Sequence, residues 1–368
     1  RLPQMSAVEV NFDGLIGPNH NYSGLSEGNL ASAHNQGQVS YPKQAALQGL
    51  EKMRKLVKAG FVQGVFPPPA RPNSVLLQAV SSPKNIADQI DSAARFAPNV
   101  LRAAYSASSM WAANAATVSP SPDTAAGRLT LTPANLVTML HRSVEATETF
   151  AMLRFIFSDP DHFQINPPLP AHSDFADEGA ANHTRLCASH GMPGVSFFVY
   201  GRKTEGAGTR LPARQSQLAS QSIAHQHGLA PERTVFARQS AAAIDAGAFH
   251  NDVVCVGTLN TLFFHELAFA DTDAVLQAIK KAATGLFELK PIMVPDAEVP
   301  IEDAIKSYLF NSQLLHWPDE DRLVLLAPSE TQDMPSTEAY CKRLVESNGP
   351  IGRVDYVDVR QSMRNGGG

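Results

Sequence analysis

The sequence has few cysteines. Three occur among 368 residues, at Cys187, Cys255 and Cys341, and no two of them form a C-x-x-C pair. An odd number of widely separated cysteines argues against a disulfide framework and against a structural zinc site. We therefore expect reduced thiols, as in a cytoplasmic protein.

Long apolar runs and a surplus of basic residues are also missing. No stretch approaches the roughly 18 to 20 apolar residues that span a bilayer, and the amino-terminal segment has no basic-then-apolar signal pattern. The sequence has 30 Lys and Arg against 35 Asp and Glu, a formal net charge of −5. Proteins that bind nucleic acid or anionic membranes usually carry a basic surplus. These absences predict a cytoplasmic protein whose partner is a small molecule, with no nucleic acid and no membrane.

The common phosphate-binding loops are absent as well. Neither G-x-x-x-x-G-K-[S/T] nor a strand-linked G-x-G-x-x-G occurs. His183 and Cys187 have the four-residue spacing of metal ligands on a helix face, but no second pair of ligands has suitable spacing. Common nucleotide loops and a zinc site are therefore not predicted.

What the sequence does contain is the composition of a folded protein. It is 43% hydrophobic and 18% charged, far from the composition of disordered chains. Its length suggests two domains or one large repeated architecture. Residues 1–4 precede Met5, a candidate initiator, so we treat them as foreign to the natural chain and leave them out of the fold prediction.

The first part of the chain predicts one strand and one well-defined helix. Residues 8–12 alternate apolar and polar side chains, as a half-buried strand does. Residues 17–41 are rich in Asn, Gly, Ser and His without any period, so they are a candidate ligand loop. Residues 45–57 have helical spacing, with Pro42 suited to the first turn and Gly60 to the end.

Helical spacing recurs further on. It predicts helices over residues 82–96 and 133–157, the second with Thr132 as its N-cap. Proline-rich residues 66–72 and 119–123 predict rigid loops, and residues 160–170 predict a break.

The second half predicts short strands alternating with helices, which is a mixed α/β pattern. Strands are expected at residues 195–200, 233–236, 252–256, 261–264, 289–294, 323–326 and 354–357. Helices are expected at residues 215–227, 272–287, 301–311 and 337–347, the second with Asp271 as N-cap. Groups of strand, strand, helix and strand recur loosely from Arg233 onward, without an exact sequence repeat.

Residues 177–185 hold a dense set of polar side chains, with two carboxylates, an amide, an imidazole and a guanidinium. A carboxylate here could orient a base or hold a cation, with Gly179 permitting close approach. The same residues also suit a helix N-terminus, where Asp177 and Glu178 favour the dipole. The residues alone leave these two interpretations equally open.

His250 and Asp252 precede an apolar strand. Two residues apart, they would face the same side of an extended segment, and a base beside a carboxylate suits proton transfer or cation binding. A His-Asn-Asp turn is the alternative interpretation, and the residues alone favour it.

The three cysteines lack the glycines or exposed loop of a reactive thiolate, and Cys255 lies within an apolar strand. From the residues alone, we interpret Asn365 and the three glycines after it as a flexible tail.

Taken together and in order, these segments resemble the N-succinylarginine dihydrolase family. The resemblance spans nearly the whole chain. Each of these short motifs alone is weak evidence for the family, but their occurrence together and in the same order is highly specific. It rests on residues 8–14, 21–29, 109–120, 140–142, 177–185, 198–201, 211–215, 250–252 and 365–368.

The resemblance implies an amidinotransferase-like, or pentein, fold, in which five ββαβ units form a propeller as a single catalytic domain over residues 5–368. It implies hydrolysis of N2-succinyl-L-arginine with two waters to N2-succinyl-L-ornithine, two ammonia and carbon dioxide, in the arginine succinyltransferase route of arginine catabolism. It implies no metal and no organic cofactor, and it suggests a homodimer.

Site residues follow from the same resemblance. Glu178 and His250 match two members of a Cys-His-Glu triad, in which a thiolate attacks the guanidinium carbon. The positions matching substrate-binding residues are Ser23, Gly24, Leu25, Ser26, Glu27, Gly28, Asn29, Leu30, Ala31, Ser32, Asn114, His141, Arg142, Arg214, Asp252 and Asn365. Arginines suit the succinyl and α-carboxylate groups, and carboxylates suit the guanidinium.

One departure from the family is the nucleophile. The family cysteine lies a few residues beyond the Asn-Gly-Gly-Gly motif, whereas this sequence stops at Gly368. We expect that the natural chain continues to that cysteine and that the propeller is incomplete here. The rival interpretations are a binding-only or inactive truncated protein, another guanidino-modifying enzyme of the superfamily, and a metal hydrolase built on Asp177, His183, His250 and Asp252.

Overall fold

Short strands alternate with helices along the whole chain. The computed structural model describes residues 7–21, 24–26, 33, 35–82, 85–202 and 209–364. The strands are β1 (Val10–Gly14), β2 (Val62–Phe66), β3 (Ala116–Ser119), β4 (Leu129–Pro133), β5 (Phe163–Ile165), β6 (His183–Cys187), β7 (Gly194–Tyr200), β8 (Thr234–Arg238), β9 (Cys255–Thr258), β10 (Thr261–His265), β11 (Lys290–Val294), β12 (Gln313–Leu315), β13 (Leu323–Pro328) and β14 (Ile351–Val357).

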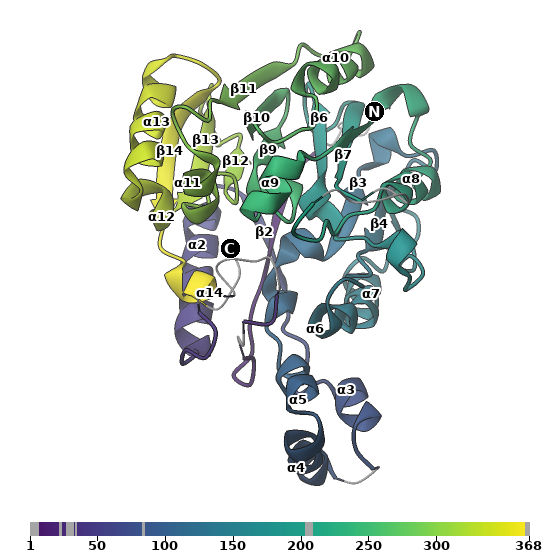
Figure 1. Ribbon diagram of the computed structural model, residues 1–368. Helices are drawn as coiled ribbons and strands as arrows, with labels where there is room; N and C mark the ends of the chain where they lie inside the picture. Colours follow the sequence, from purple (N-terminus) through teal and green to yellow (C-terminus); the bar gives the residue numbers. More distant parts are fainter. Residues whose placement is uncertain are drawn as a thin grey trace.

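The helices connect and cover these strands (Figure 1). They are α2 (Pro42–Lys58), α3 (Ser74–Ala79), α4 (Ile86–Phe96), α5 (Pro98–Ala104), α6 (Leu140–Ser143), α7 (Glu145–Ile156), α8 (Gln217–Gln226), α9 (Ala241–Ala246), α10 (Thr272–Ala282), α11 (Ile301–Lys306), α12 (Ser329–Asp333), α13 (Pro335–Glu346) and α14 (Arg360–Arg364). None of the helices in the described part of the chain is long and apolar enough to cross a bilayer.

Four sheets of the described chain share one topology. In each, the first two strands pair antiparallel and the third pairs parallel with the second, after a helical connection. The strand orders are β3-β4-β5, β6-β7-β8, β9-β10-β11 and β12-β13-β14. The loose grouping expected from Arg233 onward is therefore a structural repeat, and it begins earlier than the sequence pattern suggested.

A fifth sheet pairs β1 with β2 in parallel, connected by α2. This pair resembles the second and third strands of the other sheets. Successive sheets follow one another around the molecule, as the teal, green and yellow ribbons of Figure 1 show. The first strands of the last three sheets are neighbours, since β6 lies against β9 and β9 against β12. The fold is thus mixed α/β with several small sheets, as expected.

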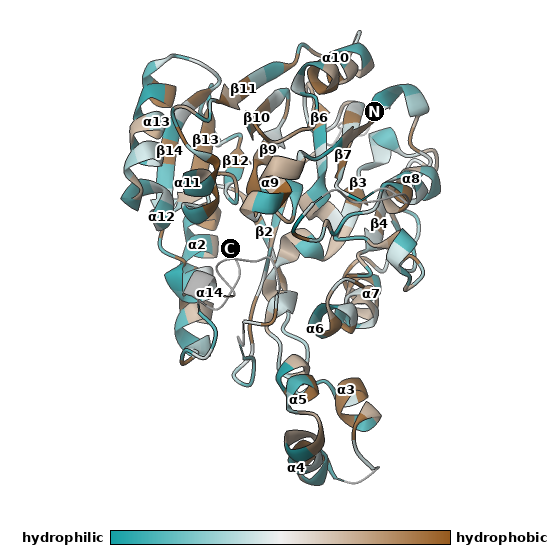
Figure 2. Ribbon diagram, viewed as in Figure 1, coloured by the Kyte–Doolittle hydropathy of each residue, from teal (hydrophilic) through white to brown (hydrophobic). Residues whose placement is uncertain are grey.

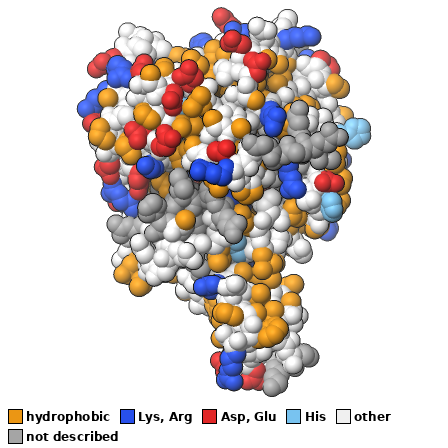
Figure 3. Space-filling model, viewed as in Figure 1, with side chains coloured by type: hydrophobic (Ala, Val, Ile, Leu, Met, Phe, Trp, Pro, Cys, Tyr) orange, Lys and Arg blue, Asp and Glu red, His pale blue; other side chains and the backbone are white. Residues whose placement is uncertain are grey.

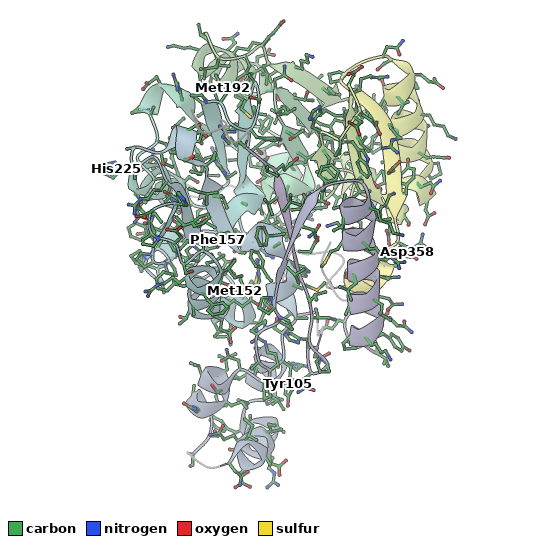
Figure 4. All side chains as sticks on the ribbon, turned by 180° about the vertical axis from the view of Figure 1, so that it is seen from behind. Tyr105, Met152, Phe157, Met192, His225 and Asp358 are labelled. Carbon is green, nitrogen blue, oxygen red and sulfur yellow. The ribbon has the colours of Figure 1, made fainter. Side chains whose placement is uncertain are left out.

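Apolar side chains fill the space between the sheets and their helices. Phe197, Phe263 and Phe264 are fully buried, in two adjoining clusters. In Figure 2, strand β13 is brown, the hydrophobic colour, and helix α12 is teal, the hydrophilic colour. Figure 4 labels Phe157, whose ring contacts Phe12 of β1 with centroids 5.7 Å apart. Burial of each such ring contributes about 1.5 to 3 kcal/mol, so the sheets are held to one another chiefly by apolar contact.

Helices α3, α4 and α5 project from the body of the molecule (Figures 1 and 3). Tyr105, labelled in Figure 4, follows α5 where the projection joins the body. At its base, Arg71 Nη1 and Asn73 Nδ2 donate to the Glu148 carboxylate at 3.1 Å. Helix α4 of this projection corresponds to the helix expected at residues 82–96. It begins only at Ile86, with Asn85 as its N-cap.

The helix predicted at residues 133–157 is wrong at its start and at its cap, while α6 and α7 occupy the rest of it. Residues 129–133, which include the expected cap Thr132, form β4 rather than leading into a helix, and helical structure begins only at Leu140. The side chain of Thr132 contacts His227 Nε2 at 2.8 Å instead of capping, and Leu136 has a φ of +51°. The pairing of β4 with both β3 and β5 outweighs the local helical spacing.

Other elements agree with the sequence. The predicted helix at residues 45–57 is α2, and Gly60 follows it with a φ of +96°. Asp271 caps α10 by accepting from Ala274 N at 3.0 Å. The break at residues 160–170 instead contains the short strand β5.

Candidate active site

Glu178 precedes β6 in the chain. A short 3-10 helix over Gly179–Asn182 separates it from β6, with Glu178 at its N-cap and Asp177 Oδ1 accepting from Gly179 N at 3.3 Å, so the expected helix N-terminus is present as a single turn. Its side chain is fully buried. Its backbone is fixed at both ends, because Asn114 Nδ2 donates to Glu178 O and Glu178 N donates to Gln215 Oε1, each at 2.8 Å.

The Glu178 carboxylate accepts three hydrogen bonds. Arg142 Nη1 reaches Oε2 at 2.6 Å, His250 Nε2 lies 2.8 Å from the same oxygen, and Thr138 Oγ1 donates to Oε1 at 2.7 Å. Burial alone would raise the pKa of Glu178. The charge of Arg142 and the bond to His250 outweigh burial and hold that pKa well below its usual range. Glu178 is therefore ionised at neutral pH.

His250 is the imidazole of this group. It is buried, it follows α9, and burial lowers its pKa to about 4 despite the opposing bond to Glu178. A neutral imidazole facing an ionised carboxylate carries its proton on the facing nitrogen, which here is Nε2. Nδ1 is then the accepting nitrogen, and it lies 4.0 Å from Asp252 Oδ1. The sequence-predicted pair His250 and Asp252 is thus brought together, through a 3-10 turn rather than an extended segment.

Two arginines are buried beside Glu178. Arg142, in α6, is 0% exposed and Arg214 is 1% exposed. Each guanidinium lies over an aromatic ring, Arg142 at 5.8 Å from Trp111 and Arg214 at 4.4 Å from Phe249. Burial lowers the pKa of Arg214 to about 10, so it remains a cation at neutral pH.

Arg142 has donors to spare. Within the part of the chain that the structure describes, its Nε and Nη2 are buried and have no hydrogen-bond partner. A buried guanidinium with unpaired donors is suited to a carboxylate brought by a ligand.

Asp252 and His141 complete the described group. Asp252 lines a cavity of about 310 Å³ together with Trp111 of the Ser109–Pro120 segment and Phe310. Burial raises the pKa of Asp252 to about 7, against a hydrogen bond from Asn311. His141 Nε2 lies 3.2 Å from Ser26 Oγ, and burial together with the charge of Arg142 lowers the pKa of His141 to about 3.

The predicted loop at residues 23–32 is described at three positions. Gly24 and Leu25 are described beside Ser26, and Gly24 has a φ of +64°. The following predicted residues lie outside the described residues: Ser23, Glu27, Gly28, Asn29, Leu30, Ala31, Ser32 and Asn365.

Sequence reasoning missed two side chains that hold this group. Thr138 lies within the helix predicted at residues 133–157, and that prediction gave its hydroxyl no hydrogen-bond partner. Gln215 follows Arg214 in the motif at residues 211–215. Its side chain accepts from Glu178 N, which lies 37 positions earlier in the sequence. No local signal could have found either contact.

The three cysteines are inert in this setting. Cys187, Cys255 and Cys341 are 1 to 2% exposed. Burial raises the pKa of Cys255 to about 12 and that of Cys341 to about 11, and it also raises the pKa of Cys187. A nucleophilic thiol needs a lowered pKa, so none of them is suited to attack. His183 and Cys187 lie in strand β6, not on a helix, and no group of three potential metal ligands occurs among the described residues.

Comparison with known proteins identifies the family. The model of the succinylarginine dihydrolase family matches residues 6–368. The chain belongs to this family. N-succinylarginine dihydrolase 2 of Caulobacter vibrioides is 56% identical over 370 residues, which cover 99% of this chain and 81% of that protein.

Solved structures extend the comparison to the fold of this succinylarginine dihydrolase family member. The N-terminal domain of ArgZ, an arginine dihydrolase from Cyanobacteria, aligns with a TM-score of 0.56 and 15% identity, covering 97% of this chain and 94% of that one. SxtG, an amidinotransferase from Microseira wollei, aligns with a TM-score of 0.57 and 12% identity, covering 99% and 92%. These similarities in the overall path of the backbone confirm the expected pentein fold class.

Proposed function

We propose that this chain carries the substrate-binding and proton-transfer groups of an enzyme that hydrolyses N2-succinyl-L-arginine. The overall reaction consumes two waters and gives N2-succinyl-L-ornithine, two ammonia and carbon dioxide. The observation that carries the proposal is the buried, ionised Glu178 bonded to a neutral His250, with two buried arginines beside them, in a member of this family. No cofactor is required by this chemistry.

Each charged group has a task that fits its surroundings. Arg142 and Arg214 bind the succinyl and α-carboxylate groups, because a guanidinium recognises carboxylates with paired donors. Asp252 binds the substrate guanidinium, which is a cation. Glu178 holds the Nε2 proton of His250, so that Nδ1 can accept and return protons during the reaction. Asn114, His141, Asn365 and residues 23–32 complete the binding surface in this proposal.

The nucleophile is proposed to be a cysteine that follows the Asn365–Gly368 motif in the complete enzyme. In support, Cys187, Cys255 and Cys341 are buried with raised pKa values. Its thiolate attacks the guanidinium carbon and ammonia leaves, giving an amidino-cysteine adduct. Water then cleaves the carbon–sulfur bond and leaves a ureido group. A second round releases the other ammonia and carbon dioxide.

The experiment compares ammonia release from N2-succinyl-L-arginine by the 368-residue chain and by a chain extended through the family cysteine. We expect two ammonia per substrate from the extended chain, and none once that cysteine is replaced by Ser. L-Arginine as substrate is the control for another guanidino-modifying enzyme. No release by the extended chain would contradict the proposal and favour a binding-only protein.

We also propose that the five sheets form a closed propeller in one domain. In support, β1 and β2 repeat the parallel pair of the other sheets, and among the described residues no strand pairs with the second edge of β1, which could accept an antiparallel first strand. A homodimer in the cytoplasm completes the proposal, and sedimentation equilibrium of the extended chain tests the dimer.

A further inference from the structure

The two oxygens of the Glu178 carboxylate have different partners. Oε2 is shared by Arg142 and His250, at 2.6 and 2.8 Å. Oε1 accepts from Thr138 Oγ1 at 2.7 Å, its one donor among the described residues. An ionised carboxylate can only accept, so the Thr138 hydroxyl is the donor.

A competing arrangement is close at hand. A carboxylate beside a guanidinium prefers two parallel hydrogen bonds, one to each oxygen. Arg142 has the donors for this, because its Nε and Nη2 are buried and have no partner in the described chain. A Glu178 carboxylate turned fully toward Arg142 would take Oε2 away from His250 and would occupy the donors that a substrate carboxylate needs.

We propose that Thr138 is a positioning residue, whose hydroxyl holds Oε1 of Glu178 away from Arg142. This single bond keeps Oε2 on His250 and leaves Arg142 with unpaired donors for an anionic group of the substrate. The inference rests on the proposed function for its effect on turnover, while the geometry that it describes belongs to the chain itself.

The local backbone supports this role. Leu136, two residues before Thr138, is buried with a φ of +51°, a conformation that persists only where surrounding contacts enforce it. Leu136 N donates to Asp177 O, and Asp177 N donates to Asn135 Oδ1, both at 3.0 Å. The segment that carries Thr138 is therefore tied to the segment that carries Glu178. Thr138 is held in register with the carboxylate by the fold, not by its own hydrogen bond alone.

Thr138→Val is the decisive variant, because valine keeps the branched shape and removes the donor. In the extended enzyme we expect kcat/KM for N2-succinyl-L-arginine to fall about 10- to 100-fold. Thr138→Ser keeps the hydroxyl and should restore most of the activity. Thr147→Val, at an exposed position of α7, is the matched control and should change nothing.

Two measurements on the 368-residue chain do not depend on turnover. By nuclear magnetic resonance, the His250 Nε2 proton should lose its downfield, carboxylate-bonded shift in Thr138→Val and keep it in Thr138→Ser. By calorimetry, the Kd for N2-succinyl-L-arginine should rise about tenfold or more in Thr138→Val, because Arg142 is then occupied by Glu178. Thr138→Ala serves in place of Thr138→Val if the valine variant does not fold.

The outcomes separate the two proposals. A Thr138→Val chain with an unchanged His250 signal and unchanged affinity overturns the positioning role, whatever the enzyme hydrolyses. A changed His250 signal without ammonia release by the wild-type extended enzyme keeps Thr138 as a positioning residue and rejects the proposed reaction instead.

Discussion

At the scale of single residues, the buried arginines carry the clearest prediction for binding. Arg214 is 1% exposed and lies over the Phe249 ring. Arg214→Lys keeps a positive charge but removes the planar fork, so we expect the Kd for N2-succinyl-L-arginine to rise about 10- to 100-fold, or about 1.5 to 3 kcal/mol. Calorimetry on the 368-residue chain measures this. Arg95→Lys, at an exposed position of α4, is the control, and equal affinities of the Arg214→Lys and wild-type chains would contradict the assignment.

Protonation of Asp252 gives a second prediction at this scale. Burial raises the pKa of Asp252 to about 7, so below that pH the carboxyl is neutral and loses its attraction for a guanidinium. We expect the Kd to rise about tenfold for each pH unit below 7 and to level off above it. His250, with a pKa of about 4, does not titrate in this range.

Asp252→Asn provides the control for that pH dependence. The pKa values of Glu145 and Asp177 are also raised by burial to about 7. The asparagine variant should bind weakly at every pH and show no slope between pH 5.5 and 7. A slope that survives in Asp252→Asn would show that another group with a raised pKa, such as Glu145 or Asp177, causes it, and would contradict the role of Asp252.

At the scale of elements, the sequence predicted strands best where apolar residues run together, as in β7, β10 and β13. It missed β2, β3, β4, β5, β6 and β12. Strand β6 contains His183, Thr184 and Arg185, whose polar side chains hide a strand pattern, although it pairs with β7, the next strand along the chain. The family resemblance supplied Glu178 and His250, whereas Thr138 and Gln215 needed the fold, because their contacts join residues about 40 positions apart.

Helix α8 offers a test of how an element end supports the site. Ser216 caps it by accepting from Ala219 N at 3.0 Å and also donates to Asp174 O at 2.7 Å. Ser216→Ala should lower the free energy of unfolding by about 1 to 2 kcal/mol, because both groups lose a buried partner. Ser222→Ala, inside the same helix, should be neutral or slightly stabilising. Urea unfolding followed by circular dichroism measures both, and equal stabilities would contradict the capping role.

At the scale of the whole molecule, stability depends on how closely neighbouring sheets approach one another. Strand β1 comes so close to the 3-10 turn Ser108–Met110 that a Cβ atom on Gly14 would overlap Met110 O. The obstructing atom is backbone, so Gly14→Ala can be accommodated only if the first sheet moves away. We expect a loss of about 1 to 3 kcal/mol in the free energy of unfolding.

Gly49→Ala is the matched control for this contact. Gly49 lies in α2, and a Cβ atom there would come no nearer than 4.0 Å, to Leu15 Cδ2. Alanine should therefore stabilise α2 by about 0.5 to 1 kcal/mol through its lower backbone entropy in the unfolded chain. Because the same substitution is made in the same first unit, opposite signs for the two variants would show that contact between sheets, and not the loss of a glycine as such, limits stability. If Gly14→Ala unfolds at the same urea concentration as the wild-type chain, the first sheet is free to shift, and its close contact with the Ser108–Met110 turn contributes nothing to holding the molecule together.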